Sequence, residues 1–353
     1  MKLLYAYRYG IVGGVSTQLL LRKQALEQAG YHCELFFSQD NGLRQVLPKA
    51  TQGVHFGALS AFRQLVVKGR FDAVIVIDTP ELLRLASGPC WHRNPVYLDV
   101  HTTTQTGLSY LEGLSVKSLA GVMVPSDYSA RLVGQRRPDW QARIHVIPNL
   151  LNTEVFAPTG SMQEGFDHPE FIWVGKLDQH KNWRLALVYA QLLRELVGPI
   201  HLYMVGGYTA PAATAEAFFE LAYRLGISDS VTWLDRVENV QLARLYHRCA
   251  ASGGAMLVTS RDESFGMAAA EALLCGCPLI TNDLPVFREV FPESSMVQRV
   301  DIWQPEQVAG AIKKLTVEKV DPGERQAMYQ TLRMRYGAAA FESALRGVIC
   351  SDT

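Results

Sequence analysis

The first half of the chain alternates between short apolar runs and longer segments with helical periodicity. Strands are predicted at Lys2–Tyr7, Cys33–Ser38, Val54–Phe56, Ala73–Asp78, Val96–Val100, Val122–Pro125 and Ile144–Ile147. Helices are predicted before Gly30 and over Ala58–Gly69, Pro80–Ala86, Gly107–Leu119 and Asp127–Gln135. Such alternation predicts a parallel sheet that is covered by helices on both faces.

The alternation stops at Asn152–Pro169, which has two prolines, two glycines and no apolar period, as expected for a linker. It then restarts. Strands are predicted at Phe171–Val174, His201–Val205, Val231–Leu234, Met256–Thr259 and Leu279–Thr281, and helices over Trp183–Leu196, Ala212–Leu225, Val240–Cys249, Phe265–Leu274 and from Pro305 onward. Two α/β units of this kind are expected to face a cleft, with ligands beyond the carboxyl ends of the strands.

Charge and composition narrow the function classes. The 353 residues contain 34 Lys and Arg against 34 Asp and Glu, which disfavours a protein that holds nucleic acid or a polybasic membrane anchor. The longest nearly apolar stretch, Phe265–Ile280, is too short to span a membrane, and the amino terminus has no signal-peptide pattern. Six cysteines without a secretion signal indicate a reducing, cytoplasmic setting.

Candidate chemistry gathers where the predicted strand Met256–Thr259 ends. Ser264 and Gly266 open the next helix, where an anion can approach free backbone N–H groups. Glu263 precedes that helix and Glu271 lies inside it among apolar residues, where a carboxylate needs a partner such as a ligand hydroxyl. The alternative is structural: Glu263 would complement the helix dipole from the first turn, and Glu271 would form a hydrogen bond within the protein.

Three further groups follow predicted strands. Lys176 and Lys181 are expected at the carboxyl edge of the second sheet, where two cations suit a diphosphate, although loop lysines are often only solvated. Gly13 and Gly14 let backbone donors approach a phosphate or sugar, or form an ordinary turn. His101 ends a buried strand on the cleft side, as a catalytic or a structural histidine would.

Several motifs of other enzyme classes are missing from the sequence. It contains no Asp-x-Asp, no set of His, Cys and carboxylates at metal-ligand spacing, no Gly-x-Ser-x-Gly and no Walker loop. Gly13-Gly14 lacks the third glycine of the dinucleotide fingerprint, which disfavours a nicotinamide dehydrogenase. We therefore expect neither a metal nor a cofactor.

Taken together, these segments resemble family 4 of the retaining glycosyltransferases, which have the GT-B fold. Glu263-Ser-Phe-Gly266 followed by Glu271 resembles the family's Glu-x7-Glu signature. Gly175-Lys176 with Lys181 resembles its diphosphate site, with Lys176 where arginine is usual, so the charge is kept but bidentate contact is lost. The resemblance spans nearly the whole chain and is strongest in the second half.

The resemblance implies a role for each matching residue. Glu271 would hold the ribose hydroxyls of a nucleotide sugar, and Glu263 would contact the transferred sugar, helped by backbone N–H groups near Ser264, Phe265 and Gly266. Lys176 and Lys181 would hold the diphosphate and would be catalytic together with Glu263 and His101. In the looser match of the first half, Gly13 and Gly14 would approach the diphosphate and His101 would lie near the transferred sugar and acceptor.

The resemblance also implies the organisation and the reaction. Two Rossmann-like doubly wound domains would comprise residues 1–153, joined by a carboxyl-terminal helix at 338–353, and residues 154–337. The reaction would be metal-independent hexosyl transfer with retention, from a UDP or GDP sugar to a glycan, a lipid-linked or a small-molecule acceptor. The protein would be cytoplasmic, with peripheral contact at the inner face of a membrane left open. The alternatives are a sugar-nucleotide epimerase or hydrolase and a non-catalytic transferase partner.

Overall fold

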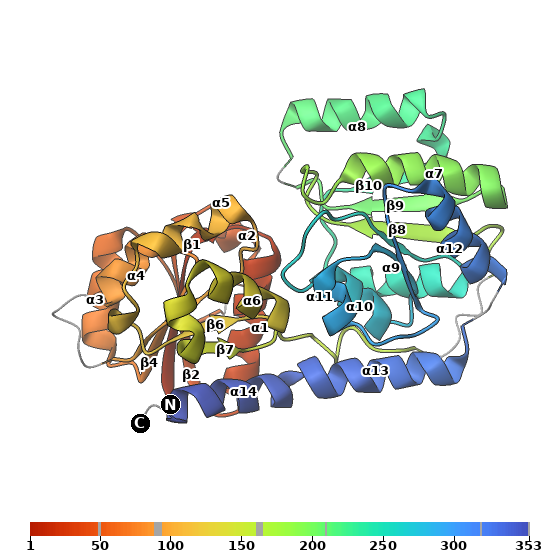
Figure 1. Cartoon of the computed structure of the whole chain (residues 1–353). Helices are drawn as coiled ribbons and strands as arrows, with labels where there is room; N and C mark the ends of the chain where they lie inside the picture. The colour runs from red at the N-terminus through yellow and green to blue at the C-terminus, as the bar shows by residue number, and fades with distance from the viewer. Residues whose placement is uncertain (49–50, 88–93, 160–164, 209, 318–319, 352–353) are drawn as a thin grey trace. The chain divides into compact units, whose positions relative to one another are not determined.

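The computed structural model describes residues 1–48, 51–87, 94–159, 165–208, 210–317 and 320–351. The chain divides into two compact units, which we call the first and the second unit (Figure 1). The first unit comprises Met1–Leu150 with Tyr336–Thr353, and the second comprises Leu151–Arg335. The predicted linker Asn152–Pro169 lies partly outside the described residues.

The first unit is built on a parallel sheet, in which the described strands have the order β3-β2-β1-β4-β5-β6-β7. The strands are β1 (Lys2–Gly10), β2 (His32–Asp40), β3 (Val54–Phe56), β4 (Ala73–Ile77), β5 (Val96–Asp99), β6 (Gly121–Val124) and β7 (Ile144–Val146). The α-helices are α1 (Gly14–Gln28), α2 (Leu43–Val46), α3 (Leu59–Gly69), α4 (Pro80–Ala86), α5 (Gln105–Leu108), α6 (Asp127–Arg136) and α14 (Ala338–Ser351). The 3₁₀-helices are η1 (Ser109–Gly113), η2 (Val116–Ser118) and η3 (Pro138–Arg143).

The side chains of this sheet alternate between two apolar cores. Leu4 and Ala6 of β1 pack on the face that α3 and α4 cover, whereas Leu3 and Tyr5 pack on the face that α1 and α14 cover. Because successive side chains of a strand point to opposite faces, continuous apolar runs mark strands that are buried on both sides. Phe341 of α14 is fully buried in the second of these cores, so residues far apart in the sequence complete one unit.

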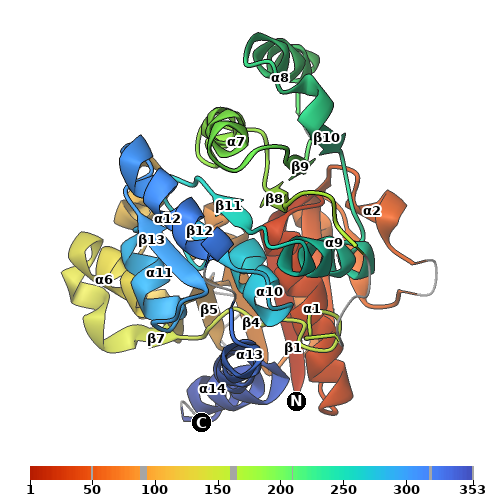
Figure 2. The ribbon, with the colours of Figure 1, turned by 90° about the vertical axis from the view of Figure 1, so that its right-hand side faces the viewer.

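The second unit has the strand order β10-β9-β8-β11-β12-β13. Its strands are β8 (Glu170–Val174), β9 (His201–Val205), β10 (Val231–Leu234), β11 (Met256–Val258), β12 (Leu279–Asn282) and β13 (Val297–Val300). Its helices are α7 (Trp183–Val197), α8 (Ala212–Arg224), η4 (Ser228–Ser230), α9 (Asn239–Ala251), α10 (Met267–Leu274), α11 (Pro285–Val290), α12 (Pro305–Val317) and α13 (Pro322–Tyr336). Helices α7, α8 and α12 share a core on one face, and Figure 2 shows α9 and α10 on the other side of the sheet.

Both sheets are doubly wound. In each, the first strand lies in the middle, the next two extend to one side and the later strands to the other. This is the order of the Rossmann fold, so the prediction of two Rossmann-like parallel sheets is confirmed. All described strand pairs are parallel, which places the loops that follow the strands at a single edge of each sheet.

The predicted helix Gly107–Leu119 is wrong. The structure has a single turn, α5, followed by two 3₁₀-helices, η1 and η2. The buried leucines of this stretch, Leu108, Leu111 and Leu114, recur every three residues, which is the period of a 3₁₀-helix. Strand β13 was not predicted, since Gln298 and Arg299 interrupt its short apolar pattern.

Candidate functional site

The switch point of the second sheet lies between β8 and β11. From there β9 and β10 extend in one direction and β12 and β13 in the other. Loops at such a point diverge to opposite faces of the sheet and leave a crevice beyond the carboxyl ends of the strands. The two loops that start here are residues 175–182 and residues 259–266, and both contain residues that the sequence marked as candidates.

The loop after β8 is shaped to carry Lys181 back toward the sheet. The carboxylate of Asp178 accepts a hydrogen bond from the backbone N–H of Lys181 at 2.8 Å. A Cβ on Gly175 would lie 3.1 Å from Cγ of Lys181, so glycine lets the lysine stem pack against the backbone. Lys176 is exposed in the same loop, and its ammonium group has no hydrogen bond or ion pair with any described residue.

Gly206, at the end of the neighbouring strand β9, fixes how close the β8 loop can come. Its φ of +123° disfavours any residue with a side chain, and a Cβ there would lie 2.2 Å from the carbonyl oxygen of Gly175. The two strand ends therefore meet backbone to backbone, with no side chain between them.

The loop after β11 brings Glu263 to Lys181. The ammonium group of Lys181 donates to Oε1 of Glu263, and Oγ of Ser260 donates to the same oxygen at 2.7 Å. Thr259 ties the two loops together, because its hydroxyl donates to the carbonyl of Lys181 at 2.9 Å. Trp173 of β8 donates its indole N–H to that hydroxyl at 3.0 Å. The Lys181–Glu263 pair is thus held in place by the ends of both strands.

Helix α10 begins where this loop ends. Gly266 is its N-cap residue, and a Cβ there would lie 2.4 Å from the ring of Phe287. Its φ of +90° also favours glycine. Ser264 and Phe265 connect Glu263 to this N-cap residue. Phe265 is buried, and Ser264 is partly exposed. The amino end of a helix is favourable for a negatively charged group.

Glu271 lies in the second turn of α10. Among the described residues nothing forms a hydrogen bond or ion pair with its carboxyl group. Burial raises the pKa of this carboxyl group to about 8, although part of the side chain still reaches solvent. A carboxylate that lacks partners in such surroundings is energetically unfavourable, and hydroxyl donors from a ligand would supply what the protein does not.

The first unit has its own switch point, between β1 and β4. Gly13 and Gly14 follow β1 and begin α1, with Gly13 as the N-cap. His101 follows β5, and its Nε2 lies 3.1 Å from Oδ2 of Asp99. Its backbone N–H donates to Oδ2 of Asp78 at 2.9 Å. The side chain of His101 is nearly buried, so both its backbone and its ring are fixed by carboxylates.

Three polar residues of this network were not predicted from the sequence: Arg22, Asp78 and Asp99. Nη1 of Arg22 donates to Oδ2 of Asp99 at 2.6 Å, and both side chains are 1% exposed. Burial alone would raise the pKa of Asp99, but His101 and Arg22 hold it well below its usual range. The available signal was a single arginine or aspartate inside an apolar run, as in Leu-Leu-Leu-Arg22 and Val-Tyr-Leu-Asp99.

The structure sorts the predicted site residues between the units. Lys181 and Glu263 form an ion pair at the second switch point, and Lys176, Ser264–Gly266 and Glu271 belong to the loops and helix that start there. Gly13, Gly14 and His101 stand at the carboxyl edge of the first sheet. In the described part of the chain, no group of three or more His, Cys, Asp or Glu side chains is arranged to hold a metal ion.

The described helices also bear on membrane insertion: none combines the length and the apolar character needed to cross a bilayer.

The sequence of the second unit matches a known family model. Residues 162–333 match the family described as glycosyl transferases group 1. A D-inositol 3-phosphate glycosyltransferase from Segniliparus rotundus is 26% identical over 216 residues, which are 59% of this chain and 46% of that protein. The protein of the same name from Gordonia bronchialis is 34% identical over 154 residues, 40% of this chain and 33% of its own length. The chain spans less than half the length of these curated relatives.

Solved structures show the same fold. HepE from Anabaena, in complex with UDP, has a TM-score of 0.81 at 17% identity and covers 99% of this chain and 100% of its own. Sucrose-phosphate synthase from Thermosynechococcus elongatus has a TM-score of 0.75 at 17% identity, with 99% and 100% covered. The predicted GT-B class of two Rossmann-like domains is therefore confirmed, and the family match supports a GT-B glycosyltransferase.

Proposed function

We propose that this chain is a retaining hexosyltransferase of family 4 that moves a sugar from a nucleotide diphosphate sugar to an acceptor hydroxyl without a metal ion. The observation that carries the proposal is the polar group at the β8/β11 switch point. Two lysines, an ion-paired carboxylate and an unpartnered carboxylate start from two loops and one helix of a unit that matches glycosyl transferases group 1. These are the charges that a sugar nucleotide would require.

The diphosphate is assigned to Lys176, Lys181 and the amino end of α10. Lys176 is exposed without a described partner, while Lys181 donates to Glu263. A diphosphate carries more negative charge than one carboxylate, so it would compete for Lys181. Donors placed where charge develops on a leaving group stabilise the transition state. We infer that the cations and the helix end take the place of a metal ion.

Release of Lys181 has a consequence for Glu263. Once the ammonium group turns to the diphosphate, the carboxylate of Glu263 keeps only the hydroxyl of Ser260 as a described partner. Its oxygens would then accept hydrogen bonds from hydroxyls of the transferred sugar. The ion pair thus keeps both groups in position before the donor binds. When the donor binds, Lys181 would contact its diphosphate and Glu263 would contact its sugar.

The nucleoside is assigned to Glu271. A ribose offers two neighbouring hydroxyl donors, which match the two oxygens of a carboxylate that has no described partner. Its neighbours in α10 are apolar, so a ligand without these hydroxyls would cover the carboxyl group and leave it unpaired, which disfavours binding of that ligand. Glu271 therefore acts in binding and not in the chemical step.

The chemical step breaks the bond between the anomeric carbon and the diphosphate oxygen, leaving an oxocarbenium-like sugar. The acceptor hydroxyl attacks from the face that the diphosphate leaves and passes its proton to the diphosphate, so configuration is retained. His101, fixed by Asp99 and Asp78, is assigned to the transferred sugar and acceptor, and Gly13 and Gly14 to the diphosphate. Solved relatives that contain UDP or UDP-glucose support a UDP-type donor as the first to test.

Thermal unfolding with UDP, GDP, ADP, dTDP and CMP, each with magnesium and with EDTA, tests donor binding. A ligand at 100 times its Kd adds about 2.7 kcal/mol to the free energy of unfolding. We expect a rise in Tm with one nucleotide that EDTA does not change. Glu271→Ala removes the shift, whereas Glu216→Ala, at an exposed glutamate of α8, keeps it. A shift that needs magnesium contradicts metal independence, and no shift at all favours a non-catalytic partner.

Turnover with the matching sugar nucleotide tests the reaction class. Incubation with an acceptor set of glycans, lipid-linked sugars and small polyols should give a product whose anomeric configuration, read by NMR, equals that of the donor. A new sugar nucleotide formed without acceptor identifies an epimerase, and free sugar alone identifies a hydrolase. An inverted product contradicts retention.

A further inference from the structure

A cavity of about 680 Å³ lies at the β3 edge of the first unit, and all its lining residues fall between residues 36 and 68. Its walls come from β2, from α2 and the segment that follows it, from β3 and from one face of α3. The volume is in the range of small-ligand sites. The described lining includes no residue of β1 or β4 and none of Gly13, Gly14 and His101.

Helix α3 presents a second face to this cavity. Phe62 and Val66 are buried against the sheet. Ala61, Gln64 and Lys68 line the cavity together with Leu65. Positions 61, 64, 65 and 68 follow the spacing of i, i+3, i+4 and i+7, which places them on one face of a helix. Ala61, Gln64 and Lys68 are exposed on this face, and Leu65 is partly buried against the apolar core of the unit.

The cavity combines an apolar floor with a basic rim. Phe36, Val54, Phe56 and Leu65 are among the apolar lining residues. The ionisable lining residues are Arg44, His55 and Lys68, and no acidic side chain belongs to the described lining. A ligand that complements this surface has an apolar body and an anionic group.

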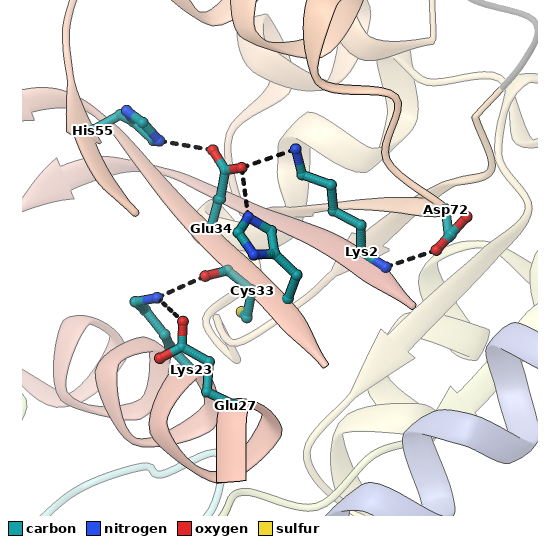
Figure 3. A network of polar contacts seen from close by, with 8 residues as sticks. Lys2, Lys23, Glu27, Cys33, Glu34, His55 and Asp72 are labelled. Atoms are coloured by element: carbon teal, nitrogen blue, oxygen red, sulfur yellow. Dashed lines mark hydrogen bonds and ion pairs between the residues drawn. The ribbon is translucent and has the colours of Figure 1, made fainter. Parts of the chain in front are cut away.

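Two of the three basic groups are already held by carboxylates beside the cavity. Nε of Arg44 lies 3.3 Å from Oδ2 of Asp40, and its guanidinium lies 4.7 Å from the ring centroid of Phe56. Nε2 of His55 lies 2.8 Å from Oε2 of Glu34, and Figure 3 shows that this carboxylate also receives Lys2 from β1. The side chains of Arg44 and His55 are 63% and 41% exposed, so both groups stay within reach of an anion beside the cavity.

Lys68 is the charge that remains available. It is exposed on α3, and no described residue forms a hydrogen bond or ion pair with its ammonium group. It also stands at the end of the helical face that begins with Ala61, seven residues and about 10 Å earlier along the axis. The cavity therefore has an uncommitted cation at one end and the small side chain of Ala61 at the other.

We propose that this cavity binds an anionic amphiphile, with its apolar chain against Phe36, Phe56 and Leu65 and its phosphate or carboxylate at Lys68, assisted by Arg44 and His55. The amphiphile is either a free molecule or the lipid of an anionic membrane, which share this chemistry. The proposal does not depend on the transferase reaction, because every residue in it lies outside the groups assigned to the donor.

Titration calorimetry with octyl phosphate, below its critical micelle concentration, tests the proposal on the full chain. We expect saturable binding at one site per chain. Octanol lacks the charge and inorganic phosphate lacks the chain, so each should bind at least about tenfold more weakly. Equal binding of octyl phosphate and inorganic phosphate would show that the apolar floor takes no part, and would overturn the proposal.

Two variants locate the site. Ala61→Trp fills the cavity from an exposed position, and Ala142→Trp is the matched control at an exposed alanine of the same unit. Lys68→Gln removes the uncommitted charge, and Lys117→Gln is its control. We expect each cavity variant to weaken octyl phosphate binding about tenfold or more, with Tm and far-UV spectrum unchanged. If both Ala61→Trp and Lys68→Gln bind octyl phosphate as tightly as the wild type, the amphiphile binds outside this cavity and the proposal is overturned.

Vesicles separate the two sources. Co-sedimentation with phosphatidylcholine vesicles, with and without phosphatidylglycerol, reports membrane binding. If anionic vesicles bind and Ala61→Trp and Lys68→Gln weaken that binding, the source is the membrane; if only octyl phosphate binds, it is a free amphiphile. If neither octyl phosphate nor anionic vesicles bind saturably, the proposal is overturned. A dimer in light scattering that Ala61→Trp abolishes also overturns it, because a second copy of the chain would then fill the cavity.

Discussion

The switch points of the two sheets have the same topology but opposite electrostatic designs. In the first unit, Arg22 and Asp99 form an ion pair whose side chains are both 1% exposed. In the second, the side chains of Lys181 and Glu263 are 28% and 12% exposed. Charges removed from water need a fixed partner, whereas a pair that still meets solvent can exchange partners at a lower free-energy cost.

The difference separates a supporting edge from a binding edge. Asp99 holds both Arg22 and His101, so the carboxyl edge of the first sheet carries a buried polar network around one candidate residue. The edge of the second sheet holds Lys176 and Glu271 without described partners beside one exchangeable pair. The strand order does not distinguish the two edges, because both sheets have the same order. The edges differ in whether their charged side chains have partners within the protein.

Breaking the buried pair should give the largest effect. Arg22→Met leaves Asp99 buried with only His101 beside it, and should lower the free energy of unfolding by about 3–5 kcal/mol. Urea denaturation of the variant measures the loss. Arg22→Lys retains a charge and should recover part of the stability. An unchanged denaturation midpoint would show that the pair contributes nothing to the first unit.

The exchangeable pair should matter for turnover more than for folding. Lys181→Ala should lower kcat about a hundredfold or more, because one donor that stabilises the leaving diphosphate is lost. Its Tm should change little, since the pair is partly exposed. Initial rates with saturating donor measure the effect, with Lys117→Ala as the exposed control. Near-normal turnover in the Lys181 variant would contradict its assigned role.

Glu271 should make stability depend on pH. Its pKa in the folded chain is about 8, against 4.5 as the usual value in the unfolded chain. Between these values the unfolded state loses a proton that the folded state keeps, so this residue lowers the free energy of unfolding as pH rises, by at most about 1.4 kcal/mol per pH unit.

The difference in unfolding free energy between wild type and Glu271→Gln, measured at pH 5, 6.5 and 8, isolates this contribution from other titrating groups. The wild type should lose stability relative to the variant as pH rises. Glu216→Gln, at an exposed position, should show no such trend. A difference that is constant across the three pH values would mean that the folded carboxyl group titrates normally.

A surface pair should give the smallest effect. Arg194 and Asp229 lie 3.0 Å apart, with side chains 41% and 77% exposed. Asp229→Asn should therefore change the free energy of unfolding by less than about 1 kcal/mol. Urea denaturation of both Asp229→Asn and Arg22→Met compares the loss in unfolding free energy for the exposed and the buried ion pair. A loss comparable to that of Arg22→Met would show that exposure does not govern the energy of ion pairs in this protein.

The strands were predictable because a strand that is buried on both faces appears in the sequence as a continuous apolar run. Runs such as Ala73–Ile77 are apolar throughout, and the structure places all five residues in the core. The helix over Gly107–Leu119 was wrong because serines and glycines weaken an α-helix there. The hydroxyl of Ser109 donates to the carbonyl of Thr106 at 2.7 Å, and local bonds of this kind compete with helical ones.

The candidate site divides in the same way. Lys181 and Glu263 were singled out because each follows a recognisable strand, and Glu271 because it is a carboxylate among the apolar residues of a predicted helix. That Lys181 pairs with Glu263 could not be read from the sequence, since 82 positions separate them. The Arg22–Asp99 pair spans 77 positions and was missed entirely. Contacts of this range depend on the register between strands, which local patterns do not encode.

The burial of α14 in the first unit has a consequence for biosynthesis. Phe341, Leu345, Val348 and Ile349 complete a core whose other buried members precede residue 151. At about 5–20 residues per second, synthesis of residues 151–335 takes roughly 10–40 s. During that time the nascent first unit exposes the apolar surface that α14 later covers. The first unit is therefore at risk of aggregation through this apolar surface until the second unit and α14 have been synthesised.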